Sequence, residues 1–430
     1  MKLFQQMLVA TAAVSFIAPL AAQASDVNLD GMNSYKHNST ARIDSKTFIN
    51  EVDEEIATLN SRIDGLEAQQ NNLEAGSFSD TTTLDGTATF SLGGTDSSLV
   101  KADGTDSLQF AYTYQLNLNT SFTGDDNLYV RLKSGNHTGY SVSKTLGTYL
   151  KSGNGNANVL EVDKIWYTFP VGEKMTAWVG PLIENYYMHG TTPSLYQPVT
   201  KQFALGGNSP AYGASTDSGA GAAYKADNGF AVSTNVVSKQ AGTNNGLLTD
   251  QSKLSWATQV GYTKPQYSVS ALVNVKANSW SDGYYETLLS SNPHIGTAKS
   301  GATEHGNFTA IGLRGWWRPE VSGTATPSVS LGYDTASYTE ATDATDTSSA
   351  WFAGFMWEDM FQADDKIGVA FGQPMTNESN ANDPFAYEVY YSFKANDSVT
   401  ITPAVFGGQD RSGTAGDDVV GAVLETTFRF

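Results

Sequence analysis

Five basic side chains are the first residues of this sequence that could act on a solute. They fall on the polar face of segments in which apolar and polar residues alternate, and they are Arg131, Lys133, Lys164, Arg314 and Arg318. A ladder of such groups inside a channel would attract anions or phosphate-bearing solutes through its field. Trp166, Trp178 and Trp316 share this face, where they could stack on sugar rings or serve as ordinary aromatics at a barrel end.

A long stretch between two alternating segments, Ile183 to Ser218, carries a second set of polar side chains. Its candidates are Glu184, Tyr186, Tyr187, His189, Tyr196, Lys201 and Gln202. Lys201 is its only lysine or arginine and Glu184 its only glutamate. If the stretch folds inward as a constriction loop, these two residues set the local field. The alternative is an outward surface loop with scattered polar residues.

The sequence shows few features of a catalytic or metal-binding site. The histidines are dispersed among linkers and long loops, at His37, His137, His189, His294 and His305. No histidine pair has the spacing of metal ligands on one element, and no Gly-x-Ser-x-Gly or phosphate-cradling glycine loop occurs. The chain contains no cysteine, which excludes disulfides and thiolate sites. We therefore expect no enzyme, no metal and no cofactor.

The elements that position these side chains are predicted to be strands. From Leu84 onward the apolar period is two, and short and long connections alternate. The predicted strands are 84–94, 108–123, 128–134, 159–169, 175–182, 219–225, 230–238, 253–263, 267–277, 306–318, 327–338, 350–357, 366–372, 385–393, 399–406 and 419–430. Sixteen strands, an even number, with alternating connections are typical of a transmembrane antiparallel β-barrel. A barrel of this width leaves an aqueous channel.

The last predicted strand has one face for lipid and one for water. Val420, Ala422, Leu424, Thr426, Phe428 and Phe430 alternate with Gly421, Val423, Glu425, Thr427 and Arg429. Phe428 and Phe430 are interpreted as the assembly signal of an outer-membrane barrel. This strand should pair with the one near Leu84 and so remove both sheet edges.

Three segments are predicted before the barrel domain, which is assigned to residues 80–430. Residues 1–24 have a basic start, an apolar core and Ala22-Gln23-Ala24, the pattern of a cleaved signal peptide. Residues 25–48 are predicted to be a polar linker. Residues 49–75 carry a heptad seam of Ile49, Val52, Ile56, Leu59, Ile63, Leu66 and Leu73, with Gln70 at a polar position. This predicts a coiled coil that holds a homotrimer; the alternative is a helix packed on its own barrel.

Composition restricts the partners. The chain has 430 residues, 16% charged residues and a net charge of -19, with a pI near 4.5. No basic stripe could neutralise phosphates, so nucleic acid is not expected as a partner. We place most of the acidic excess in outer loops, at residues such as Asp343, Asp346, Asp417 and Asp418. The inner basic ladder and the outer acidic loops would then oppose each other.

Several motifs together resemble the cyanobacterial branch of the carbohydrate-selective (OprB-type) porins. They are Ile165-Trp166-Tyr167-Thr168-Phe169-Pro170 with Gly172-Glu173-Lys174, Gly312-Leu313-Arg314-Gly315-Trp316-Trp317-Arg318-Pro319, Ile401-Thr402-Pro403-Ala404-Val405-Phe406, and Glu425-Thr426-Thr427-Phe428-Arg429-Phe430. The resemblance implies a trimeric porin in the outer-membrane lipid that passes ions and small hydrophilic solutes, with its termini and coil in the periplasm.

The resemblance has one gap, because residues 25–48 are too few for the surface-layer-homology domain that many relatives carry. The coil could instead contact the cell wall. A structural outer-membrane protein with a plugged barrel is therefore the alternative function, and a soluble secreted β-sandwich is a third hypothesis.

The assembly signal is testable by Phe430→Ala. We expect less folded barrel in the outer membrane because the assembly machinery loses its terminal aromatic, with unchanged conductance in the channels that do form. Heat-modifiable electrophoresis of outer-membrane fractions measures the first quantity and single-channel recording the second. Normal assembly levels would contradict the assignment.

Overall fold

The computed structural model describes most of the predicted barrel. It covers residues 77–79, 81–97, 107–144, 146–207, 210–212, 217–239, 252–278, 307–339, 346–411 and 413–430, with Leu247, Thr249 and Trp280. The predicted signal peptide, linker and coiled coil lie outside these residues. Within the described part, no helix has the length and apolar character needed to cross a membrane.

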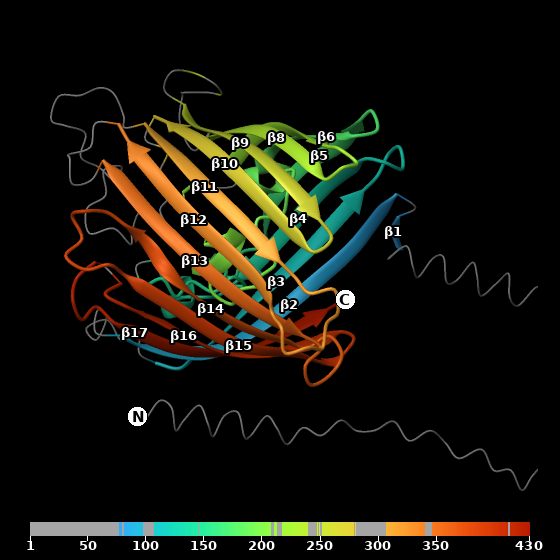
Figure 1. Ribbon diagram of the computed structural model, residues 1–430. Coiled ribbons are helices and arrows are strands. Elements are labelled where there is room, and N and C mark those ends of the chain that lie inside the picture. Colours follow the sequence, from blue (N-terminus) through green and yellow to red (C-terminus); the bar gives the residue numbers. More distant parts are fainter. Residues whose placement is uncertain are drawn as a thin grey trace, which may run out of the picture. The chain divides into compact units, whose positions relative to one another are not determined.

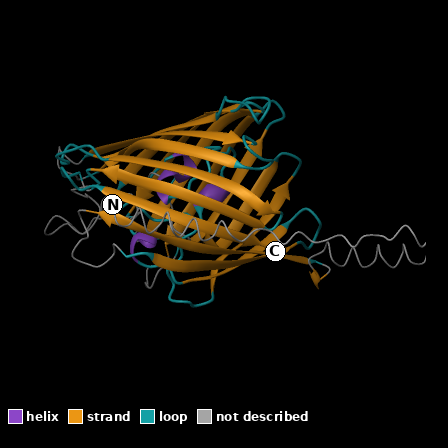
Figure 2. Cartoon of the chain, turned by 90° about the horizontal axis from the view of Figure 1, so that it is seen from below, coloured by secondary structure: helices purple, strands orange, loops and turns teal. Residues whose placement is uncertain are grey.

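Strands dominate the part of the chain that the structure describes. They are β1 (Ser77–Ser79), β2 (Thr82–Ser97), β3 (Gln109–Thr120), β4 (Asn127–Gly135), β5 (Glu161–Val171), β6 (Met175–Ile183), β7 (Asp217–Lys225), β8 (Phe230–Lys239), β9 (Lys253–Lys264), β10 (Tyr267–Ala277), β11 (Phe308–Trp317), β12 (Ser328–Tyr338), β13 (Thr347–Glu358), β14 (Lys366–Thr376), β15 (Phe385–Asn396), β16 (Val399–Gln409) and β17 (Val419–Arg429). Three short 3-10 helices accompany them, η2 (Gly139–Val142), η3 (Asn185–Met188) and η4 (Lys201–Gly206). Figure 2 shows short helical turns in purple between the orange strands.

The strands close into an antiparallel barrel (Figure 1). Each strand from β2 to β16 pairs with the next, and β17 returns to β2 in a register that runs from Val419↔Ser97 to Arg429↔Thr87. The backbone of Phe430 is bonded to Gly86 in both directions, at 2.8 and 3.1 Å. The sheet therefore ends on itself, which leaves no open edge to expose backbone groups to lipid.

The predicted fold class is confirmed. All sixteen predicted strands are present as β2 to β17, with bounds that shift by a few residues, as when 84–94 becomes Thr82–Ser97. The short β1, which pairs with β2, was not expected. The predicted pairing of the last strand with the first is also observed, and the lipid-facing parity of β17 matches that of β2 across eleven paired residues.

The two faces of the wall have opposite chemistry. Along β10, Val269, Val273 and Val275 are exposed on the outside, while Ser270 and Asn274 are buried inside. The other strands continue this pattern, so the bare barrel carries a band of exposed apolar side chains. An apolar outside and a polar inside are what a barrel in lipid requires, since hydrocarbon offers no partner to polar groups.

One end of the barrel has tight turns that use the same device twice. In the β3–β4 turn, Asp126 accepts bonds from the backbone of Phe122 and Thr123 and from the Tyr167 hydroxyl, at 2.6 to 2.9 Å. Asp365 in the β13–β14 turn does the same, with Tyr391 as its hydroxyl donor at 3.0 Å. The bond from Tyr167, together with the local donors, holds the pKa of Asp126 well below its usual range. Each carboxylate thus ties a turn to a neighbouring strand.

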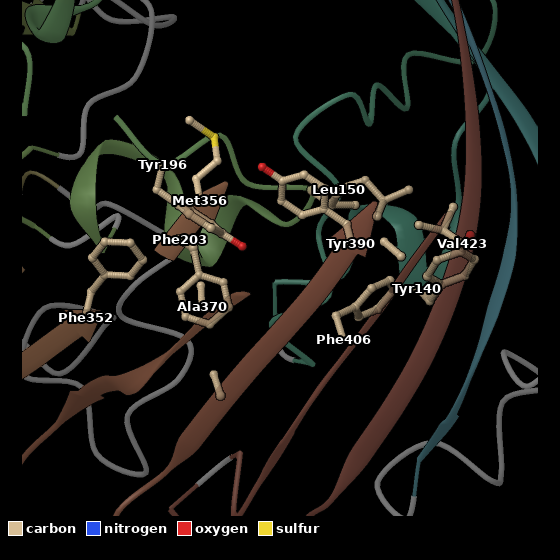
Figure 3. Close-up of a cluster of buried hydrophobic side chains, with 13 residues drawn as sticks. Tyr140, Leu150, Tyr196, Phe203, Phe352, Met356, Ala370, Tyr390, Phe406 and Val423 are labelled. Carbon is tan, nitrogen blue, oxygen red and sulfur yellow. The ribbon is translucent and has the colours of Figure 1, made fainter. Parts of the chain in front are cut away.

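The apolar core lies inside the barrel, between loops and wall. In the largest cluster, shown in Figure 3, Tyr140 and Leu150 come from the β4–β5 connection and Tyr196 and Phe203 from the β6–β7 connection. They pack on inward side chains of β13 to β17, such as Phe406. The β4–β5 connection therefore folds into the barrel. Tyr140 and Leu150 are 1% and 0% exposed, and in an outer loop water would surround them.

This packing generates a stability prediction for Phe406→Ala. Phe406 is fully buried against the Tyr140 ring, so truncation should lower the free energy of unfolding by about 3 to 5 kcal/mol and loosen the β4–β5 connection. Urea unfolding in lipid vesicles measures the loss. The neighbouring Val405→Ala, on the outer face, is the control and should cost about 1 to 2 kcal/mol. Equal losses would show that Phe406 has no special packing role.

Candidate channel constriction

The described residues of the β6–β7 connection, 184–207 and 210–212, run across the inside of the wall and are bonded to several of its strands. The amide of Gly190 donates to Ser233 Oγ on β8 at 3.0 Å, and that of Thr191 donates to Gln259 Oε1 on β9 at 2.9 Å. Leu195 N then donates to Ser330 Oγ on β12 at 3.0 Å. This connection, called the β6–β7 loop below, is therefore an inner layer of the barrel.

A buried carboxylate on β15 holds the far part of the β6–β7 loop. Glu388 is 0% exposed and accepts four hydrogen bonds. The Tyr196 hydroxyl and Val199 N donate to Oε1 at 2.9 and 3.1 Å, while Thr200 N and Oγ1 donate to Oε2 at 2.9 and 2.6 Å. Four donors on two oxygens match the acceptor capacity of a carboxylate, so the loop backbone is fixed at this point.

An ion pair on β11 and β12 holds the end of the same loop. Arg314 Nη2 lies 2.8 Å from Asp334 Oδ2, and Arg314 Nε donates to Leu205 O at 2.8 Å. The carbonyl of Gly206 lies so close to Gly332 that any Cβ there would collide with it. Arg314 faces inward as predicted, but the β6–β7 loop covers it and leaves it 4% exposed. It fastens the loop and does not line the open lumen.

The β4–β5 connection, residues 136–160, forms a second inner loop that pairs with the first. Leu150 and Thr200 form an antiparallel bridge, flanked by Lys151 N to Val199 O and Lys201 N to Tyr149 O, both at 2.8 Å. Ser152 Oγ of this β4–β5 loop also donates to Glu425 on β17. The two inner loops therefore act as one layer.

A third connection joins this layer near the loop ends. Arg411, in the β16–β17 connection, donates from Nη2 to Gln202 Oε1 at 2.8 Å and from Nε to Leu146 O at 3.2 Å. Its side chain is 1% exposed. Three connections that are distant in sequence are therefore locked together inside the barrel.

The wall formed by β3, β4 and the first residues of β2 stays partly exposed inside and carries charge. Arg131 and Lys133 project from β4, and Arg131 pairs with Asp163 on β5. Lys164 Nζ lies 2.5 Å from Glu184 Oε2 at the start of the β6–β7 loop. This side of the lumen is where the inner loops leave room for solutes.

Aromatic rings form a continuous stack beside these ion pairs. Centroid distances are 4.3 Å for Tyr129 and Trp166, 4.7 Å for Trp166 and Tyr187, and 4.6 Å for Tyr187 and Tyr186. Lys164 Nζ lies 5.1 and 5.8 Å from the Tyr187 and Tyr186 centroids. Lys164 therefore lies against two of these rings as well as against Glu184.

Lys201 faces this charged wall from the inner loops. Its ammonium lies 3.7 Å from the centroid of the Tyr149 ring. Removal from bulk water lowers the pKa of Lys201 to about 8, although Glu184 acts in the other direction. The structure therefore brings Glu184, Tyr186 and Lys201 together with Arg131, Lys133 and Lys164.

Two predicted site residues lie elsewhere. His189 packs edge-on against Tyr212 with centroids 5.4 Å apart, and both ring nitrogens are buried without a hydrogen-bond partner among the described residues. Burial lowers the pKa of His189 to about 3, so the ring stays neutral at physiological pH. Arg318 lies at the short-turn end, exposed, where its Nε donates to Pro265 O at 2.6 Å.

Sequence reasoning missed three residues that shape the site, Glu388, Glu425 and Arg411. A signal existed for Glu388, since a glutamate among Phe385, Tyr387 and Val389 must face the lumen by parity. No pattern indicated its partners. Within the described ranges, no group of three or more His, Cys, Asp or Glu side chains could hold a metal ion.

A closed antiparallel barrel with an apolar outside, and with loops folded into a polar lumen, is the architecture of an outer-membrane porin. Comparison with known proteins gives the family. The chain belongs to the carbohydrate-selective porin, OprB family, whose model matches residues 41–430.

Relatives in two cyanobacteria and solved structures with a similar fold were also found. An uncharacterized protein of Nostoc sp. is 27% identical over 425 residues, which cover 87% of this chain and 70% of the relative. An uncharacterized protein of Synechocystis sp. is 33% identical over 134 residues, or 31% of this chain and 24% of that protein. The fold is similar to that of Pseudomonas putida OprB, with a TM-score of 0.56, 12% identity and coverage of 84% and 96% of the two chains. It is also similar to a loop-deleted Vibrio cholerae OmpT, with a TM-score of 0.51, 10% identity and coverage of 81% and 99%.

The anchoring carboxylate generates a prediction for Glu388→Ala. Loss of all four acceptor bonds should release the β6–β7 loop and lower the free energy of unfolding by about 3 kcal/mol or more. Single-channel recordings should then show larger and noisier conductance. Glu358→Ala, which removes a carboxylate 3.7 Å from Lys366 at the short-turn rim, is the matched control and should conduct normally. Quiet currents of normal size in Glu388→Ala would contradict the anchoring role.

Proposed function

We propose that this porin is a passive diffusion channel for ions and small hydrophilic solutes, and that the two inner loops set its width. The observation that supports the proposal is that the inner loops fill one side of the lumen and leave the other side partly open. Loops and apolar side chains cover the inner face of β8 to β16, whereas polar residues of β2 to β4, such as Asn117 and Arg131, remain partly exposed inside. A polar strip beside a fixed loop layer leaves a wet path along the barrel.

The constriction in this proposal lies between Lys201 on the loop layer and the β4–β5 wall. Glu184, Tyr186, Arg131, Lys133 and Lys164 would line it, while Arg314, Arg318 and His189 would not. Carbohydrates are proposed as solutes because the family is described as carbohydrate-selective and because stacked rings such as Tyr187 and Tyr186 suit sugar faces.

Assembly and orientation are also part of the proposal. A homotrimer would bury outer-face aromatics of β17, β2 and β3, where Phe90 lies 5.2 Å from Phe428 and 6.1 Å from Phe110. β2 begins and β17 ends at the short-turn end, which we assign to the periplasm together with the predicted coil. The structural alternative, in which the coil binds the cell wall, depends on residues 49–75 outside the described part.

The channel is tested by adding bulk to its proposed path. Asn117 lies opposite Arg131 on the inner face of β3, and the adjacent Leu118 points to lipid. Purified protein in a planar bilayer should give stepwise conductance, which Asn117→Trp should reduce roughly twofold or more by narrowing the path. Leu118→Trp should leave it unchanged. A folded, inserted barrel that never conducts would overturn the proposed function.

A further inference from the structure

Basic side chains outnumber carboxylates at the proposed constriction, although several of them form ion pairs. Five basic groups act on one another there, and they are Arg131, Lys133, Lys144, Lys164 and Lys201. Two carboxylates lie among them, Asp163 and Glu184. Arg131 pairs with Asp163, and Lys164 pairs with Glu184 at 2.5 Å. These four charges cancel in pairs.

Three lysines remain without an ion pair among the described residues. They come from three elements, Lys133 from β4, Lys144 from the β4–β5 loop and Lys201 from the β6–β7 loop. None of the salt bridges within 4.0 Å involves them. Lys133 stands on the wall, whereas Lys144 and Lys201 belong to the loop layer.

Other lumenal carboxylates accept hydrogen bonds from neighbouring side chains, although Glu161 stands directly across from Lys133 in the register of β4 and β5. Asp85 on β2 accepts bonds from Asn117 and Asn119 at 2.6 and 3.4 Å. Glu161 accepts from Asn156 at 3.0 Å toward the end of the barrel with long connections. Glu425 is bound by Ser152 and interacts with Lys151.

We infer that Lys133, Lys144 and Lys201 form an anion site in the lumen, which makes this channel prefer small inorganic anions over cations. The inference rests on the proposed diffusion function. Like charges on both sides of a passage add their potentials, whereas an acidic loop facing a basic wall would cancel them at its centre. Coulomb's law gives about a threefold change in ion concentration for each unit charge about 7 Å away in water. Three such charges outweigh the single carboxylate of Glu161 across from Lys133 and the more distant acids, which salt screens.

Reversal potentials across a potassium chloride gradient test the site. Wild-type channels should favour chloride, and Lys133→Gln with Lys201→Gln should lower the chloride-to-potassium permeability ratio about threefold or more. Lys174→Gln, which removes a turn lysine paired with Asp227 at 2.6 Å, is the matched control and should not alter the ratio.

A pH series supplies a test that needs no neutral variant. The groups that face Lys201 are Tyr149 and Lys144 of the β4–β5 loop, Glu184 of its own loop, Lys133 of β4, and Asp163 and Lys164 of β5. Because the pKa of Lys201 is lowered to about 8, its charge is present at pH 7 and largely lost at pH 9. Chloride preference should fall over this range, and Lys201→Arg should retain more of it because guanidinium stays charged.

The outcomes separate the two proposals. The anion site is overturned if the channel conducts but prefers potassium at pH 7. It is also overturned if neither the lysine variants nor pH changes the selectivity. Both results are compatible with the proposed diffusion channel. Inserted protein that conducts no ion overturns the diffusion channel itself. Chloride preference that falls with the variants and with rising pH supports both.

Discussion

The buried carboxylate of Glu388 is the contact on which the shape of the lumen depends. A barrel of this width cannot fill its own interior with wall side chains, so something from a loop must do so. The β6–β7 loop could reach many positions, and its backbone donors would be satisfied equally well by water. Four bonds to one buried carboxylate select a single position, because no other described group offers that loop the same set of acceptors.

The β4–β5 loop depends on that same position. Thr200 makes the bridge to Leu150 and is also held by Glu388, so one residue joins the β4–β5 loop to the anchor. Tyr140 of this loop packs on Phe406, so apolar packing adds to the hydrogen bonds between loop and wall. The barrel therefore has a dry half, where loops and wall exclude water, and a wet half that carries the charges. Polar anchoring and apolar packing are coupled through the loop layer.

Much of the wall could be predicted from sequence because strand periodicity is local. Alternation alone identifies the lipid-facing side of Phe385, Tyr387 and Val389. An even number of strands lets the last strand, β17, pair antiparallel with β2. The loop layer could not be predicted in the same way. Leu150 meets Thr200, and Arg411 meets Gln202, across long sequence separations that leave no period to read. Arg314 is an example of this limit of sequence reasoning. Strand parity predicts correctly that its side chain points inward, but not that the β6–β7 loop covers it.

Net charge is a poor guide to the field at the constriction. The chain carries -19 charges, yet at physiological salt a charge farther than about 8 Å through water is largely screened. Acidic residues such as Asp417 and Asp418 in the β16–β17 connection act mainly at the mouth of the channel. Lys133 and Lys201 line the proposed constriction, so an ion in transit comes close to them and salt screens their charges little. An ion in transit therefore meets the charge of a few fixed side chains, and Lys201 among them follows directly after Thr200, which Glu388 holds.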